Sequence, residues 1–123
     1  MPETIESDIW SGLSGEPTTG EQVAAHLDAI ASLMRRENWD PQLYGPASDR
    51  RLETAFRETV GDGQGNSDTR YAGRQIIEHL LRSKLAVRYV NAWAWSEHPV
   101  RTLDDVLTVL AEAATFARTH GPR

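Results

Sequence analysis

The feature that most limits how this chain can fold is its small supply of large apolar side chains. Leu, Ile, Val and Phe together supply 25 of the 123 residues, whereas Ala alone supplies 14. A chain of this length can build one modest hydrophobic core, and Ala is the residue that most favours helices. We therefore expect an all-α protein, a small four-helix bundle-like domain over residues 18–123 with an N-terminal arm over residues 1–17.

Composition and charge exclude several classes of protein. The chain has no cysteine, so it cannot carry a disulfide scaffold or a thiolate metal site. The acidic N-terminus lacks the basic and apolar regions of a secretory signal, and no apolar run could span a membrane. The net charge of −5 argues against non-specific nucleic-acid binding. We expect a cytoplasmic protein without metal, cofactor, membrane or nucleic-acid partner.

Four segments repeat apolar residues at helical spacing. They predict helices over residues 18–38, 48–60, 68–84 and 102–120. The first helix is expected to begin at Thr18 or Thr19, and the other expected N-caps are Ser48, Ser67 or Asp68, and Thr102. Thr18 and Thr102 are each followed three positions later by an acid, which is the capping-box pattern. The predicted core contains Leu27, Ile30, Phe56, Ile77, Leu80, Leu107 and Leu110.

Three smaller features refine this picture. His26 lies at the edge of the first apolar stripe and is interpreted as a boundary residue. Gly73 inside the third helix predicts a close approach between helices, because Gly otherwise costs helix stability. The sequence GDGQGNS over residues 61–67 is interpreted as a connecting loop, because it matches neither a phosphate-binding nor a calcium-binding pattern.

Residues 85–95 fit two structures. Leu85, Val87 and Tyr89 alternate with other residues as in a strand, but the same segment also continues the helical stripe. A single strand has no pairing partner elsewhere in this sequence. A helix that breaks near Ser83 is therefore favoured over a strand.

The N-terminal arm, residues 1–17, is acidic and carries Trp10 within a short amphipathic segment. A helix of that length is marginal in isolation, so the segment needs a surface on which to dock. We favour docking of Trp10 on its own domain, with presentation of Trp10 to another protein as the alternative.

The segment from Trp93 to Thr102 is the strongest candidate for a binding surface. Trp93, Trp95 and Arg101 belong to the residue types that dominate protein-binding hot spots. Together with Trp10 they are the candidate protein-binding residues. We nevertheless favour an interpretation that places both Trp side chains in the core and pairs Arg101 with Glu97, because a core this poor in Leu and Ile needs its Trp residues.

A second hypothesis places a small-ligand or acid–base site in the same turn. Trp95, Glu97, His98 and Arg101 would supply an aromatic wall, a carboxylate, an imidazole and a guanidinium. Such groups could bind and protonate a small anionic substrate if they converged on one pocket. No other catalytic combination of residues is visible, so no catalytic residue is assigned.

Arg70 and Arg74 stand one helical turn apart in the third predicted helix. Acids interleave with the basic residues throughout this part of the chain, and no helix-turn-helix pattern accompanies them. The pair is therefore interpreted as part of a solvated helix face.

The chain carries a family resemblance that is strongest over residues 91–118. Trp39 closes the first helix, and a Trp-polar-acidic turn, Trp95-Ser96-Glu97, leads through Arg101-Thr102 into an acidic, Val/Leu-rich last helix. This pattern resembles a family of small actinobacterial and actinophage proteins, domain of unknown function 6197, over about residues 20–118. The resemblance implies a shared helical fold and a phage-related or actinobacterial setting, and it implies no activity.

These observations favour a non-enzymatic protein-interaction or regulatory module over an enzyme. The thin core also suggests a homodimer, because two copies can bury apolar surface that one copy leaves exposed. The expected dimer patch combines Val87, Val90 and Trp93 with the arm around Trp10. A monomer whose arm covers that patch is the alternative.

Overall fold

The computed structural model describes residues 7–12, 14–39 and 51–123, and within these ranges it contains helices and no strands. The elements are a 3₁₀ helix η1 (Ser7–Ser11) and the α-helices α1 (Gly20–Glu37), α2 (Leu52–Gly61), α3 (Ser67–Leu85), α4 (Ala92–Ser96) and α5 (Leu103–His120). The predicted all-α fold is confirmed.

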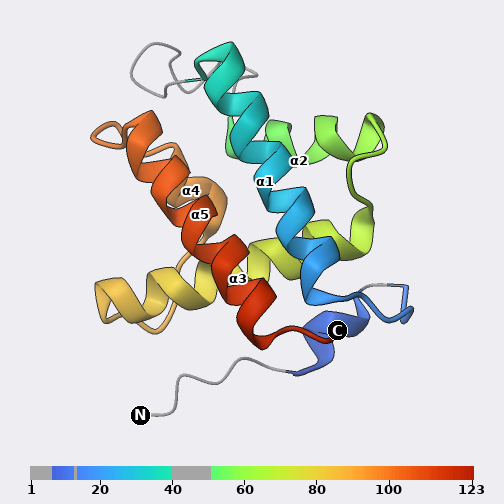
Figure 1. The fold of residues 1–123 in the computed structure, drawn as a ribbon. Helices are drawn as coiled ribbons and strands as arrows, with labels where there is room; N and C mark the ends of the chain where they lie inside the picture. Colours follow the sequence, from blue (N-terminus) through green and yellow to red (C-terminus); the bar gives the residue numbers. More distant parts are fainter. Residues whose placement is uncertain (1–6, 13, 40–50) are drawn as a thin grey trace.

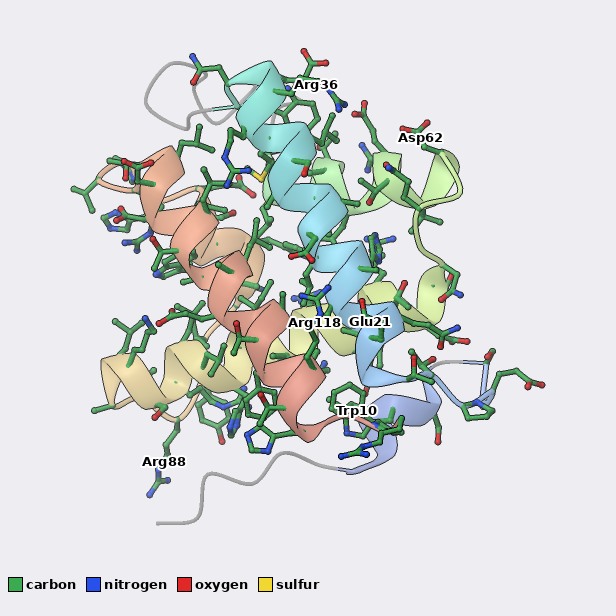
Figure 2. The ribbon with its side chains drawn as sticks, in the orientation of Figure 1. Trp10, Glu21, Arg36, Asp62, Arg88 and Arg118 are labelled. Atoms are coloured by element: carbon green, nitrogen blue, oxygen red, sulfur yellow. The ribbon has the colours of Figure 1, made fainter. Side chains whose placement is uncertain are left out.

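Helices α1 and α5 run antiparallel and side by side, and α3 crosses both of them (Figure 1). These two helices approach closely at Gly20, where an added Cβ would overlap the carbonyl oxygen of Ala117. On the exposed side of the pair, Arg118 donates hydrogen bonds of 2.9 Å to both Glu21 and Asp28 (Figure 2). This hydrogen bond with Arg118 lowers the pKa of Glu21 below its usual value.

The hydrophobic core draws on η1 and on all five α-helices. Five of the seven predicted core residues are buried, and Leu80 and Leu107 are partly buried against the core. Gly73 is at a close approach, as predicted, because an added Cβ would lie 3.2 Å from both Leu27 and Phe56.

Capping follows the prediction in α5 and differs from it in α1 and α3. Thr102 and Asp105 form the predicted capping box. In α1 the box is formed by Thr19 and Gln22 instead of Thr18 and Glu21, which leaves the Glu21 carboxylate free to pair with Arg118.

Helix α3 is capped by Asn66. Ser67 becomes the first residue of the helix, and the Asp68 carboxylate accepts a hydrogen bond of 2.9 Å from the Ser14 N–H. The predicted cap Ser48 lies outside the described residues, and α2 has Arg51 at its N-cap.

Residues 85–95 form neither a strand nor a continuous helix. α3 ends at Leu85 because Ala86 adopts a left-handed conformation with φ of 55°, three residues beyond the predicted break at Ser83. The Val87 N–H then bonds to the Arg82 carbonyl at 3.1 Å, and the chain continues irregularly to α4. Leu85, Val87 and Tyr89 are exposed at this connection.

The described part of the N-terminal arm docks on its own chain. η1 packs against α3, and Ile9 and Trp10 are buried in the core cluster. The Thr18 N–H donates a hydrogen bond of 2.7 Å to the Trp10 carbonyl, which ties the arm to the start of α1. Docking of Trp10 on its own domain, the favoured interpretation, is confirmed.

Candidate functional site

An open pocket of about 320 Å³ lies between the first half of α3 and α4. Its lining residues are Ser67, Arg70, Tyr71, Arg74 and Trp93, which we call the Arg–Trp pocket. The volume is at the lower end of the range for small-molecule sites. The pocket therefore has room for one small ligand or for one side chain of a partner.

Helical spacing places the four α3 residues together. Ser67, Arg70, Tyr71 and Arg74 stand at positions i, i+3, i+4 and i+7, so they share one face of the helix. The other wall is the indole of Trp93, which packs edge-to-face on Phe56 with ring centroids 5.2 Å apart. Because Phe56 is fully buried, this contact fixes the Trp93 ring to the core.

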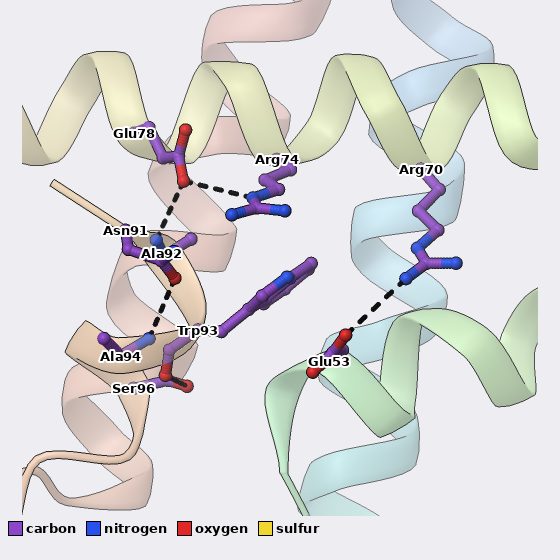
Figure 3. Close-up of polar contacts among 9 residues, drawn as sticks. All are labelled: Glu53, Arg70, Arg74, Glu78, Asn91, Ala92, Trp93, Ala94 and Ser96. Carbon is purple, nitrogen blue, oxygen red and sulfur yellow. Dashed lines mark hydrogen bonds and ion pairs between the residues drawn. The ribbon is translucent and has the colours of Figure 1, made fainter. Parts of the chain in front are cut away.

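Arg74 is held in place by two partners. Its guanidinium carbon lies 4.7 Å from the centroid of the Trp93 ring, and its Nε donates a hydrogen bond of 3.1 Å to Glu78 (Figure 3). The same oxygen of Glu78 accepts a hydrogen bond of 2.9 Å from the Ala92 N–H at the start of α4. Arg74 and Glu78 therefore join α3 to α4.

Arg70 is held far less tightly. Among the described residues it forms an ion pair with Glu53 of α2, across a distance of 3.9 Å that exceeds a hydrogen bond (Figure 3). The side chains are 38% and 34% exposed, so solvent weakens this attraction. A guanidinium has five N–H donors, and Arg70 keeps most of its capacity for an anion that enters the pocket.

The turn after α4 carries a second contact between arginine and tryptophan. The guanidinium carbon of Arg101 lies 4.2 Å from the Trp95 ring centroid, and its Nε donates a hydrogen bond of 2.9 Å to the Trp95 carbonyl. Glu97 pairs with Arg51 at 3.7 Å, so the expected Arg101–Glu97 pair is wrong. Arg101 instead lies 4.0 Å from Asp105, one turn into α5.

The residues of the acid–base hypothesis make separate contacts. Glu97 is turned toward α2, whereas the exposed His98 accepts a hydrogen bond of 3.3 Å from the Val100 N–H. Neither of them lines the Arg–Trp pocket, and the same holds for Trp95 and Arg101. Of the predicted binding residues, Trp93 lines the pocket, and Trp10 is buried.

A closed polar cluster occupies the other side of α3. His26 is fully buried, and its Nδ1 and Nε2 lie 2.8 Å from Thr69 Oγ1 and 2.7 Å from Thr59 Oγ1. The interpretation of His26 as a boundary residue is wrong, because α2 and α3 both cover that edge of α1. We call His26, Thr59 and Thr69 the His–Thr cluster.

The pKa of His26 is lowered to about 4, mainly by burial; a backbone hydrogen bond with Phe56 opposes this shift, and the positive charge of Arg70 adds to it. Each threonine hydroxyl also has a backbone carbonyl within reach, Phe56 at 2.9 Å for Thr59 and Asn66 at 3.1 Å for Thr69. Either neutral tautomer of the imidazole is therefore fully hydrogen-bonded.

Sequence reasoning missed the α3 face of the pocket. The sequence pattern predicts a solvated surface for Arg70 and Arg74, and it indicates no role for Tyr71. The available signal was a tyrosine between two arginines on one face of a helix that begins directly after a glycine-rich loop. That signal becomes specific only when Trp93 is known to lie beside it.

Within the described residues, no group of three or more metal-binding side chains is close enough to hold an ion, and no helix is long and apolar enough to cross a bilayer.

A family model described as a family of unknown function, DUF6197, matches residues 18–116. No curated protein and no solved structure matches the chain.

Proposed function

Since this chain belongs to the DUF6197 family, whose function is unknown, we propose a function from its own residues: a non-enzymatic protein-interaction module. In this proposal an acidic segment of a partner protein binds in the Arg–Trp pocket. If binding in the pocket changes the activity of that partner, the module is a regulatory one. Its proposed setting is the cytoplasm of an actinobacterium or of a phage-infected cell.

One observation carries this proposal: a loosely paired arginine, Arg70, faces an open pocket whose other walls are Tyr71 and the fixed Trp93. Trp, Tyr and Arg are the residue types that contribute most to protein binding. They do so best where the site is formed before the partner arrives, because less conformational entropy is then lost. The hydrogen bonds and ring contacts of Arg74 and Trp93 provide such a site.

The test compares capture of partner proteins by three forms of the intact chain. The wild type, an Arg70→Gln variant and an Arg57→Gln variant are immobilised and exposed to an extract of the cells of origin. Arg57 is exposed on α2 and is not a pocket residue, so its variant matches the change of charge alone. We expect a protein that the wild type and Arg57→Gln retain and that Arg70→Gln loses.

Circular dichroism of each form checks that the helices are intact. A partner that all three forms retain equally would place the binding surface outside the pocket. Loss of the partner from both variants would attribute binding to net charge rather than to the pocket.

Two further hypotheses stay predictions. For the acid–base site, Arg101 stacks on Trp95, but Glu97 pairs with Arg51 and His98 is exposed, so the four groups do not converge on one pocket. Self-association through Val87, Val90 and Trp93 is supported by the exposure of Val87, and a dilution series measured by light scattering tests it. Because Trp10 is buried, its side chain adds little to that patch.

A further inference from the structure

We propose that Glu53 is an internal competitor of the ligand: its carboxylate occupies Arg70 when the Arg–Trp pocket is empty, and the anionic group of the ligand replaces it. This inference rests on the proposed function, because it concerns regulation of the same pocket. It assigns the ligand a chemical class, a carboxylate or phosphate carried on an aromatic or apolar body.

Two ion pairs lie at the pocket, and they differ in strength: one is held firmly, and the other can be replaced by a ligand. Arg74 and Glu78 are joined by a hydrogen bond, and Glu78 is also bound by the Ala92 N–H and is mostly buried. In the other pair, Arg70 Nη2 and Glu53 Oε2 lie 3.9 Å apart, and about a third of each side chain is exposed. A ligand anion therefore displaces Glu53 at low cost, whereas displacement of Glu78 would break the contact between α3 and α4.

The walls of the pocket indicate what the anion is attached to. Tyr71 and Trp93 present ring surface beside Arg70, and Ser67 in the first turn of α3 offers a hydroxyl. Since one face of Trp93 is occupied by the Arg74 guanidinium, the ligand meets the remaining ring surface. An acidic peptide with a neighbouring apolar side chain has this chemistry, and so does a peptide that ends in an aromatic residue with a free carboxylate.

The experiment measures binding of three defined probes by isothermal titration calorimetry at low salt. N-acetyl-phenylalanine carries a carboxylate, phenyl phosphate carries a phosphate, and N-acetyl-phenylalaninamide has the aromatic ring without the charge. We expect binding of at least one charged probe and none of the amide. Glu53→Gln should tighten that binding about three-fold, the range expected when an exposed ion pair no longer competes.

Two matched variants define the outcome. Glu58→Gln removes the same charge from an exposed position of α2 and should leave binding within the error of the wild type. Arg70→Gln should weaken binding about ten-fold, as expected for loss of a charged hydrogen-bond donor. Thermal unfolding of each variant confirms that it is folded under the conditions of the titration.

The possible failures are distinguishable. If no charged probe binds to any form, the pocket is not an anion site, and both this inference and the proposed function fall. If a probe binds in a manner that depends on Arg70, but Glu53→Gln binds no more tightly than Glu58→Gln, then the competitor role of Glu53 alone is overturned. The relative affinities of N-acetyl-phenylalanine and phenyl phosphate show which anion the pocket prefers.

Discussion

The two polar clusters on opposite sides of α3 differ in how completely their groups are satisfied. In the His–Thr cluster, both ring nitrogens of His26 face hydroxyl groups at hydrogen-bond distance, and the cluster is sealed from solvent. In the Arg–Trp pocket, Arg70 faces Glu53 at a distance longer than a hydrogen bond, and the space beside it is open.

The difference shows which cluster stabilises the fold and which is available for binding. A buried polar group without a partner costs more free energy than its hydrogen bond contributes, so closed clusters are retained only when complete. An exposed cation can stay incompletely paired at little cost, because water solvates it. The His–Thr cluster should therefore govern stability, and Arg70 should govern binding.

The largest expected effect is on stability, from replacement of His26. His26→Ala removes a fully buried ring and leaves a cavity between α1, α2 and α3. By comparison with large-to-small substitutions in protein cores, the free energy of unfolding should fall by about 4 kcal/mol. Urea denaturation at pH 7, followed by circular dichroism, measures this free energy of unfolding. His98→Ala, at an exposed histidine, is the control and should change it by less than about 0.5 kcal/mol. Equal effects of the two substitutions would contradict the contrast between the clusters.

The second prediction concerns pH. The folded protein holds the pKa of His26 at about 4, below the ordinary histidine value of 6.5. As the pH falls below about 6.5 the unfolded chain takes up a proton that the folded chain excludes, so stability decreases until about pH 4. The contribution of His26 is fully present above pH 6.5, and about 3 kcal/mol of it is lost by pH 4.

Comparison with His26→Gln isolates this contribution from that of the carboxylates, which titrate in both proteins. The variant should be less stable than the wild type at pH 7, and the difference between the two should shrink by about 3 kcal/mol between pH 6.5 and pH 4. Parallel stability profiles would show that His26 is accessible to protons in the folded state.

The helices could be predicted from local pattern, and the two clusters could not. The periodicity of α5 and its cap at Thr102 lie within a single segment, so neighbouring residues alone determine them. The burial of His26 depends on Thr59 and Thr69, which are 33 and 43 residues away along the chain. Helical periodicity describes one face of one helix, whereas His26 lies where the three helices α1, α2 and α3 meet.

The pocket illustrates the same limit. Arg70 and Arg74 look solvated within α3, because acids are interspersed among the bases of that segment. The wall opposite them comes from Trp93, and its position depends on the end of α3 at Ala86 and on the return of the chain into α4. An alanine in a left-handed conformation has no distinctive sequence signal, because glycine is the residue usually found there.

The smallest expected effect is a difference in the free energy of unfolding between variants of the two pocket arginines, Arg74 and Arg70. Arg74→Gln leaves the mostly buried carboxylate of Glu78 with the Ala92 N–H but without its cation, so the free energy of unfolding should fall by about 1 kcal/mol. Arg70→Gln removes an exposed and loosely paired cation, and should change it by less than about 0.5 kcal/mol. Urea denaturation at pH 7 measures both. Adding Glu78→Gln to Arg74→Gln removes the unpaired charge and should restore part of the loss, whereas Glu53→Gln added to Arg70→Gln should restore nothing measurable. If Arg70→Gln is as destabilising as Arg74→Gln, Arg70 is a structural residue and its pairing with Glu53 is not exchangeable.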